Sequence, residues 1–329
     1  MQSVTENKLK KEINYSLNVL KCLGIFAVIC IHCRLFNLGT KGEIITCLSR
    51  FAVPVFFMIS GYFSFFSDND KAVFKYKTRI IKLIKLFIIS NIIYLIYDIL
   101  AAGGKHYIHT MTLKKLFECI VFNVSFTEIH LWFISALIYC YIIFYVMGKL
   151  NFDYRKLYKF VPILFIFSLI IAEFSHFYNI NLAICYYRNF LFTGLPFFIL
   201  GYYFHEKEFI LTDISNRILV LAMIFGAFLT VVEMFAIGRI DLYAGTIILS
   251  VSMFAFCIKN PEKLNFKLIG FIGWHLYTSM YILHYLIFRI IKEYMKVGYF
   301  TPIIVFVLTA LVCFVIYWVG VEVKKTRTV

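Results

Sequence analysis

The sequence has little charge for its length. Only 16% of its 329 residues are Asp, Glu, Lys or Arg, whereas these four make up about a quarter of a soluble domain. In contrast, 62% of the residues are hydrophobic and the mean hydropathy is +0.84. A soluble fold of this size cannot bury so much apolar surface. This composition therefore excludes a soluble globular protein and predicts one whose solvent is largely lipid.

Acidic residues are scarcer than basic ones, with 18 Asp and Glu against 33 Lys and Arg, which gives a net charge of +15. In a soluble protein this excess would suggest a nucleic acid partner. Here the basic residues cluster in short segments between apolar stretches, which is typical of membrane topology and of contact with anionic lipid. We therefore expect membrane lipid and no nucleic acid as a partner. A basic cytoplasmic surface would also attract an anionic cosubstrate.

The nine cysteines show neither the spacing of a disulfide framework nor that of a zinc site. Cys30, His32 and Cys33 are close in sequence, but neighbouring helical positions point in different directions and no fourth ligand is near. We expect no metal site and no permanently bound cofactor. A cleavable signal peptide is not expected either, because the first apolar run is long and interrupted by Lys21.

Ten apolar segments have lengths typical of transmembrane helices. They are residues 15–36, 45–66, 80–101, 131–148, 157–177, 188–204, 218–237, 242–258, 268–290 and 299–321. With ten spans, the segments on one side of the membrane contain 21 Lys and Arg and those on the other contain 11. The side richer in Lys and Arg is normally cytoplasmic. We therefore predict a single all-α, polytopic domain over residues 1–329, in the plasma membrane, with both termini in the cytoplasm and one long outer loop at 102–130.

Two polar residues in the first span share one helix face. Lys21 and His32 are eleven residues apart, which corresponds to three turns plus about 20° and to about 16 Å along the axis. Ionisable groups within a span usually face the protein interior or a polar cavity. The spacing is compatible with a ligand lying along the helix, its phosphate end at Lys21 and its reactive end at His32. It is equally compatible with a snorkelling lysine and a hydrogen-bonded core histidine.

The spacing from Lys21 to His32 resembles the Arg-x10-His signature of the acyltransferase family 3 membrane proteins. Five other stretches are similar to the family in the same order along the chain. They are Arg50-Phe-Ala-Val-Pro54 continuing to Ser60-Gly61-Tyr62, Lys77-Thr-Arg79, His130-Leu-Trp132, Leu195-Pro196 continuing to Gly201, and Tyr281-Ile-Leu-His284. The resemblance covers nearly the whole chain. It departs at Lys21, where the family usually has Arg, and at Asn18, where it usually has Asp.

The resemblance implies an O-acetyltransferase that moves an acetyl group from cytoplasmic acetyl-CoA to a hydroxyl of an extracytoplasmic cell-envelope glycan or lipid-linked sugar. In this interpretation His32 is the catalytic residue. A neutral imidazole can act as general base near neutral pH, or it can carry the acyl group covalently. We favour the general base. Lys21 keeps the positive charge expected beside the CoA phosphates but lacks the two-pronged guanidinium of Arg.

Further candidates follow from charge and position. The candidates for binding acetyl-CoA phosphates, besides Lys21, are Lys75, Lys77 and Arg79; those for binding the acceptor are Arg50, His130, Trp132 and Glu173. Arg50 can alternatively polarise the thioester carbonyl. Ser60-Gly61 is expected to serve helix packing. Weaker candidates are Arg188, Glu233, Arg239 and Arg289, and we expect His275 and His284 to pack or hydrogen-bond rather than bind a ligand.

A second functional class fits the same features. Charged residues in a cavity within a membrane also suit a transporter or a non-catalytic solute-binding module. Glycine- or proline-interrupted helices at matching places in two symmetric halves would favour transport. Pro54 and Pro196 are the only prolines well inside the predicted spans, and the halves show no evident symmetry. We therefore prefer the acyltransferase.

Overall fold

The computed structural model describes residues 14–102, 112–178, 180 and 182–327, and all regular secondary structure in these ranges is helical. The α-helices are α2 (Tyr15–His32), α3 (Thr40–Leu48), α4 (Ala52–Tyr62), α5 (Asn69–Ala102), α7 (Leu113–Phe122), α8 (Trp132–Lys149), α9 (Phe160–Phe177), α10 (Leu195–Glu206), α11 (Ile210–Asp213), α12 (Asn216–Ile237), α13 (Ala244–Lys259), α14 (Lys267–Phe271), α15 (Tyr277–Tyr294) and α16 (Thr301–Arg327). Short 3₁₀ segments are η1 (Leu35–Leu38), η2 (Ser49–Phe51), η3 (Ile129–Leu131), η4 (Tyr154–Lys159) and η5 (Ile184–Tyr186). Two segments, η6 (Phe190–Gly194) and η7 (Ile272–Leu276), are π-helical.

Helical structure is found in each of the ten segments predicted to span the membrane. By length and composition, six stretches among the described residues can cross a bilayer: 15–32, 40–62, 69–101, 129–149, 216–237 and 301–323. The shorter α13 is also apolar. A multi-pass helical membrane protein is thus confirmed, while the number of ten spans and the side on which each terminus lies stay predictions.

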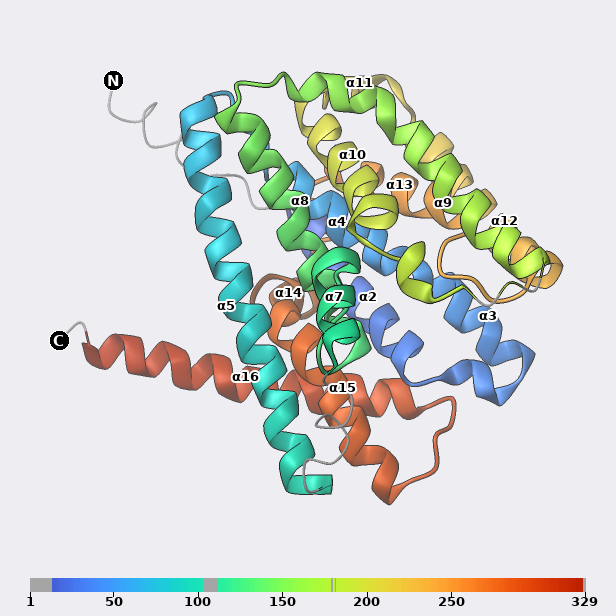
Figure 1. Cartoon of the computed structure of the whole chain (residues 1–329), viewed down its shortest axis with the longest axis vertical. Helices are drawn as coiled ribbons and strands as arrows, with labels where there is room; N and C mark the ends of the chain where they lie inside the picture. The colour runs from blue at the N-terminus through green and yellow to red at the C-terminus, as the bar shows by residue number, and fades with distance from the viewer. Residues whose placement is uncertain (1–13, 103–111, 179, 181, 328–329) are drawn as a thin grey trace.

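Helix α2 lies in the centre of the bundle, between α5 on one side and α9 and α12 on the other (Figure 1). It begins after Asn14, whose side chain accepts a hydrogen bond from the amide of Leu17 at 2.8 Å and so caps the helix. It packs against α4, α13, α14 and α15, and 72% of its spanning window is buried. A helix that is apolar on all sides and surrounded by others is the natural core of such a bundle.

The outer helices present apolar side chains to the surroundings. Only 11% of the spanning window is buried in α5, 22% in α12 and 17% in α16. Exposed Ile, Leu, Val and Phe side chains occur along all three helices. A large apolar surface of this kind suits contact with lipid acyl chains.

Glycine allows two pairs of helices to approach closely. In α4, a Cβ added to Gly61 would lie 1.9 Å from the carbonyl oxygen of Phe198 in α10, and one added to Gly201 would lie 2.0 Å from that of Met58. Gly61 therefore serves helix packing, as predicted. Similarly, Gly273 in η7 lies directly against the backbone of Asn18 in α2.

The predicted long loop at 102–130 contains a helix. Helix α7 begins after Thr112, which caps it by accepting from the amide of Lys115 at 3.2 Å, and it ends at Asn123 in the left-handed conformation. Helix α7 has separate polar and apolar faces, but it is only ten residues long. A helix this short is marginal on its own, so the sequence signal for it is weak. His106 and His109 lie outside the described residues.

Candidate active site

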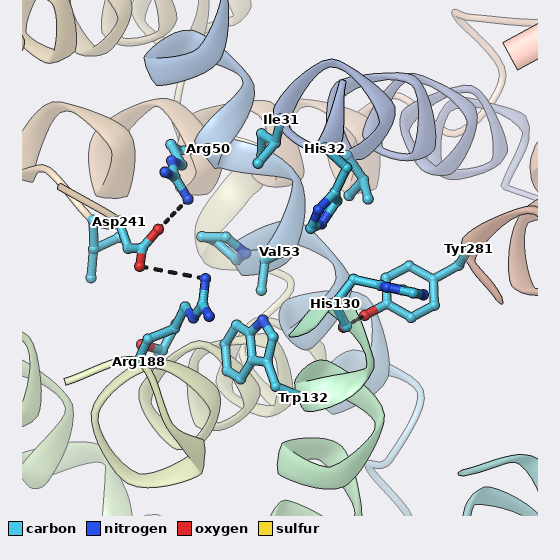
Figure 2. A pocket seen from close by; sticks show the side chains of 13 residues that line it. Ile31, His32, Arg50, Val53, His130, Trp132, Arg188, Asp241 and Tyr281 are labelled. Carbon is cyan, nitrogen blue, oxygen red and sulfur yellow. Dashed lines mark hydrogen bonds and ion pairs between the residues drawn. The ribbon is translucent and has the colours of Figure 1, made fainter. Parts of the chain in front are cut away.

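A small polar cavity lies at the C-terminal end of α2, with a volume of about 50 Å³. Its lining comes from residues far apart in the sequence: Val28, Ile31, His32, Arg50, Val53, Pro54, His130, Trp132, Arg188, Thr193, Asp241, Leu242 and Tyr281. The structure thus brings together four of the predicted site residues, His32, Arg50, His130 and Trp132. Figure 2 shows Arg50, Asp241 and Arg188 on one side of this cavity, and His32 and His130 on the other.

Three charged side chains form a bridge across one wall. Nη1 of Arg50 pairs with Oδ1 of Asp241, and Nη1 of Arg188 lies 3.5 Å from Oδ2 of the same carboxylate (Figure 2). The Arg side chains are 15% exposed and the Asp 9%. Two cations share one anion, so the wall keeps one net positive charge. In a largely buried site such a charge attracts anions strongly.

Local hydrogen bonds hold the loop that carries Asp241 between α12 and α13. The hydroxyl of Tyr243 donates to the carbonyl of Gly238 at 3.0 Å and accepts from the amide of Ile240 at 3.1 Å. Burial by itself would raise the pKa of the Asp241 carboxyl, but the adjacent guanidinium groups of Arg50 and Arg188 outweigh burial and hold this pKa below its usual value. The carboxylate is therefore ionised at neutral pH.

His130 and Trp132 lie at the start of α8, where η3 turns the chain into the cavity. Tyr281 of α15 donates its hydroxyl hydrogen to the carbonyl oxygen of His130 and so fixes this turn (Figure 2). The guanidinium of Arg188 stacks over the ring of Trp132, 5.3 Å from its centroid. This cation–π contact makes Trp132 part of the polar wall.

Lys21 lies eleven residues before His32, in an aromatic surrounding. Its ammonium is 5.8, 5.5 and 5.3 Å from the ring centroids of Phe63, Trp274 and Tyr277, respectively. Its Nζ also donates to the side chain of Asn18 at 3.3 Å. Asn18 thus contributes an amide oxygen as the partner of this cation.

Arg79, another predicted phosphate ligand, is hydrogen-bonded to the end of α4. It donates to the carbonyl of Phe63 and to Oγ of Ser64, both at 2.7 Å, and to the hydroxyl of Tyr141 at 3.0 Å. It therefore holds the C-terminal end of α4, beside the Phe63 ring that contacts Lys21. The side chains of Lys75 and Lys77 are exposed on α5.

Other predicted candidates lie elsewhere. Glu233 caps α13 by accepting from the amides of residues 244 and 245, and Arg289 pairs with Glu128 at 2.6 Å and with Asp98 at 3.8 Å. Arg239 stacks over Phe36, 3.9 Å from the ring centroid. The side chain of Glu173 lies outside the described residues.

Asp241 was not predicted from the sequence, and Arg188 was only a weak candidate. Asp241 lies in a short segment between two apolar stretches, where a charged residue is expected simply because it faces water. Its position between Arg239 and Leu242, at the edge of a predicted span, was the one available signal. Its partners, 191 and 53 residues away, are apparent only in the folded chain.

The architecture and the cavity define a polytopic helical membrane protein with an imidazole and a cationic wall facing one buried pocket. Residues 14–321 match the model of a family described as an acyltransferase domain, acyltransferase family 3. Because the match covers nearly the whole chain, the protein belongs to this family of membrane acyltransferases. Neither the search of curated proteins nor that of solved structures gave a significant match.

Proposed function

We propose that this protein is a membrane O-acetyltransferase that transfers an acetyl group from cytoplasmic acetyl-CoA to a hydroxyl of an extracytoplasmic cell-envelope sugar. The observation that carries the proposal is the pocket in which His32 faces the Arg50–Asp241–Arg188 bridge. A base and a cationic wall that line the same pocket are what acyl transfer to a hydroxyl requires. Membership of the family supports the transferase over the transporter or solute-binding module.

In the proposed reaction His32 is the general base. Its neutral ring takes the proton of the acceptor hydroxyl while the oxygen attacks the thioester carbonyl, forming a tetrahedral oxyanion. The intermediate then expels the CoA thiolate, which takes the proton back from His32, so the ring ends neutral. A single base is sufficient for both transfers.

Arg50 is the group best suited to the oxyanion. Its Nε is buried and has no hydrogen-bond partner among the described residues, while its Nη1 is held by Asp241. A fixed guanidinium with a spare N–H is an effective donor to a carbonyl oxygen that gains negative charge. Arg188, His130 and Trp132 form the rest of the wall and would contact the acceptor.

The size of the cavity supports a short acyl group. A water molecule needs roughly 10–15 Å³ of such volume, so about 50 Å³ accommodates about three to five waters. An acetyl group has two carbons and one oxygen, which fits this space.

The donor would lie along α2. Lys21 is three helical turns from His32, about 16 Å along the axis, and the extended pantetheine arm of acetyl-CoA separates its phosphates from its thioester. Lys21 would hold the phosphate end, with Lys75, Lys77 and Arg79 forming the basic entrance on α5. The positive-inside rule supports a plasma-membrane orientation in which this end faces the cytoplasm.

The test uses membranes containing the full chain, labelled acetyl-CoA and a cell-envelope extract as acceptor. We expect release of the CoA thiol and labelling of the glycan fraction, with both lost in His32→Gln at an equal protein level. Lys21→Gln is expected to raise the KM for acetyl-CoA with little change in kcat, because Lys21 is remote from the reacting atoms. Normal glycan labelling by His32→Gln would refute the proposed mechanism.

A further inference from the structure

Three imidazole rings meet at the edge of the pocket. The ring centroids of His32 and His284 are 5.3 Å apart, those of His32 and His130 are 5.6 Å apart, and those of His130 and His284 are 5.0 Å apart. They come from α2, η3 and α15. Unlike the other two, His284 does not line the pocket, and it is completely buried. Among the described residues no group of His, Cys, Asp or Glu has metal-site geometry.

The protonation of His284 follows from its backbone contacts. Its Nδ1 lies 2.8 Å from the carbonyl oxygen of Tyr281 and 3.2 Å from that of Met280. Carbonyl oxygens only accept, so Nδ1 carries the hydrogen. In a neutral ring Nε2 is then an acceptor, and this buried atom has no hydrogen-bond partner among the described residues.

His130 has the opposite tautomer. The hydroxyl of Tyr94 donates its one hydrogen to the carbonyl of Ile282 at 2.6 Å. The Tyr94 hydroxyl oxygen can therefore only accept a hydrogen bond from Nε2 of His130, which lies 3.4 Å away, so Nε2 carries the hydrogen. Nδ1 of His130 is then the bare acceptor, and it too is buried without a partner in the described part of the chain.

Thus both neighbours of His32 present unprotonated nitrogens, and the remaining N–H of the cluster is that of the neutral His32 ring. Leaving a buried acceptor unsatisfied costs about 1–3 kcal/mol, so we expect this N–H to point to one of the two. For two imidazoles whose nitrogens face each other at about 3 Å, the hydrogen-bond distance, the ring centroids are roughly 5 Å apart. His32 and His284 satisfy this spacing. Such contacts commonly shorten only when substrate binds.

We propose that His284 is the positioning residue of the general base: its Nε2 accepts a hydrogen bond from one ring nitrogen of His32, so that the other ring nitrogen presents its lone pair to the acceptor hydroxyl. This inference rests on the proposed function. When His32 takes the hydroxyl proton it gains a second N–H, and the first remains bound to His284. His284 stays neutral throughout, and the proton leaves with the CoA thiolate.

A neutral acceptor suits this location. In serine hydrolases a carboxylate orients the catalytic histidine, but an additional carboxylate inside a membrane bundle would cost desolvation energy. An imidazole locked by two backbone carbonyls supplies the same directional lone pair without a charge. The N–H of its Nδ1 is fixed by its own helix, so His284 has no freedom to switch tautomer.

The experiment compares His284→Phe, which removes the acceptor, with His284→Gln, whose amide oxygen can replace Nε2. We expect His284→Phe to lower kcat roughly 100-fold with KM for acetyl-CoA unchanged within about twofold, because the lost interaction acts on the base. His284→Gln should recover at least about tenfold over the Phe variant. His275→Phe, at an exposed position of the π-helix η7, is the matched control and should behave as wild type.

A packing role would give different results. His284→Phe would then keep its kcat, or the Phe and Gln variants would be equally impaired, and either outcome overturns the inference. If the Phe variant does not accumulate, His284→Met replaces it, since Met and Gln are similar in size and only Gln carries a strong acceptor. The absence of glycan labelling by the wild-type chain refutes the proposed function itself, and activity retained in His32→Gln refutes His32 as its base. Loss in His32→Gln together with full activity in His284→Phe refutes only the role of His284.

Discussion

Neutralising Asp241 should destabilise the protein through the two arginines left behind. In the Asp241→Asn variant the side chain keeps its shape, but Arg50 and Arg188 face each other in a largely buried wall without a counter-charge. At the 3.5 Å separation of Arg188 from the carboxylate, the gross attraction is about 5 kcal/mol with an effective dielectric constant near 20. Removing one partner of a buried pair costs about 3–5 kcal/mol. The amide still accepts a hydrogen bond, so we expect the lower end, about 3 kcal/mol.

The assay is thermal unfolding of the purified full chain in lipid nanodiscs. A loss of about 3 kcal/mol corresponds to a fall in Tm of roughly 4 °C, because a chain of 329 residues has an unfolding entropy of about 0.7 kcal/mol/K. Glu118→Gln is the matched control: Glu118 pairs with Lys114 across one turn of α7 at 3.9 Å, with the lysine 84% exposed, and such surface pairs contribute only a few tenths of a kcal/mol. The triple variant with Arg50→Gln and Arg188→Gln should regain stability without activity.

The pH dependence has a definite sign. Because the pKa of Asp241 is lower in the folded protein than in the unfolded chain, its contribution is fully present above the unfolded value, about 4, and is lost as pH falls through the folded value. The difference in Tm between wild type and Asp241→Asn should therefore stay constant from pH 6 to 8 and shrink only in acid. An unchanged Tm in Asp241→Asn, or a difference that disappears near pH 7, would contradict the ionised bridge.

Three further substitutions test the scaffold. Gly61→Leu should prevent accumulation of folded protein, because its Cβ would meet the carbonyl of Phe198 at 1.9 Å, whereas Gly320→Ala meets nothing within 4 Å and should leave Tm unchanged or slightly higher. Arg79→Lys replaces the planar guanidinium, whose two terminal nitrogens reach three acceptors at the end of α4, by a single nitrogen. We expect the free energy of unfolding to fall by about 1–3 kcal/mol in the same assay. Tyr243→Phe removes the two hydrogen bonds that hold the loop between α12 and α13. Tm should therefore fall by an amount equivalent to about 1–2 kcal/mol. We expect kcat to fall as well, because the carboxylate of Asp241 loses its position.

The local pattern of the sequence was sufficient for the class of protein. Apolar stretches and alternating basic segments depend on the partition of each segment between water and lipid, which is a property of its own side chains. The shared face of Lys21 and His32 likewise follows from helical periodicity alone. The order of the motifs from Arg50 to His284 was sufficient for the family, which the match over residues 14–321 confirmed.

The lengths and ends of the helices could not be predicted from local sequence patterns. Segment 102–130 gave no strong signal for α7, because a ten-residue amphipathic helix is marginal without its tertiary contacts. Equally, the sequence did not indicate that α13 and the stretch 188–204 are too short to meet the length expected of a spanning helix. Close packing at glycines places these helices: Gly201 of α10 lies against α4, and Gly245 of α13 lies against α12.

By itself the sequence determined a helical membrane protein, the residue types available for catalysis and the helix that carries His32. Only the tertiary structure decided which of these residues are in contact. Arg50 pairs with Asp241, 191 residues away in the sequence, and the ring of His284, from the other end of the chain, contacts that of His32. The physical reason is that helix periodicity is a short-range property, whereas the partner of a buried charge or lone pair depends on how separate helices pack.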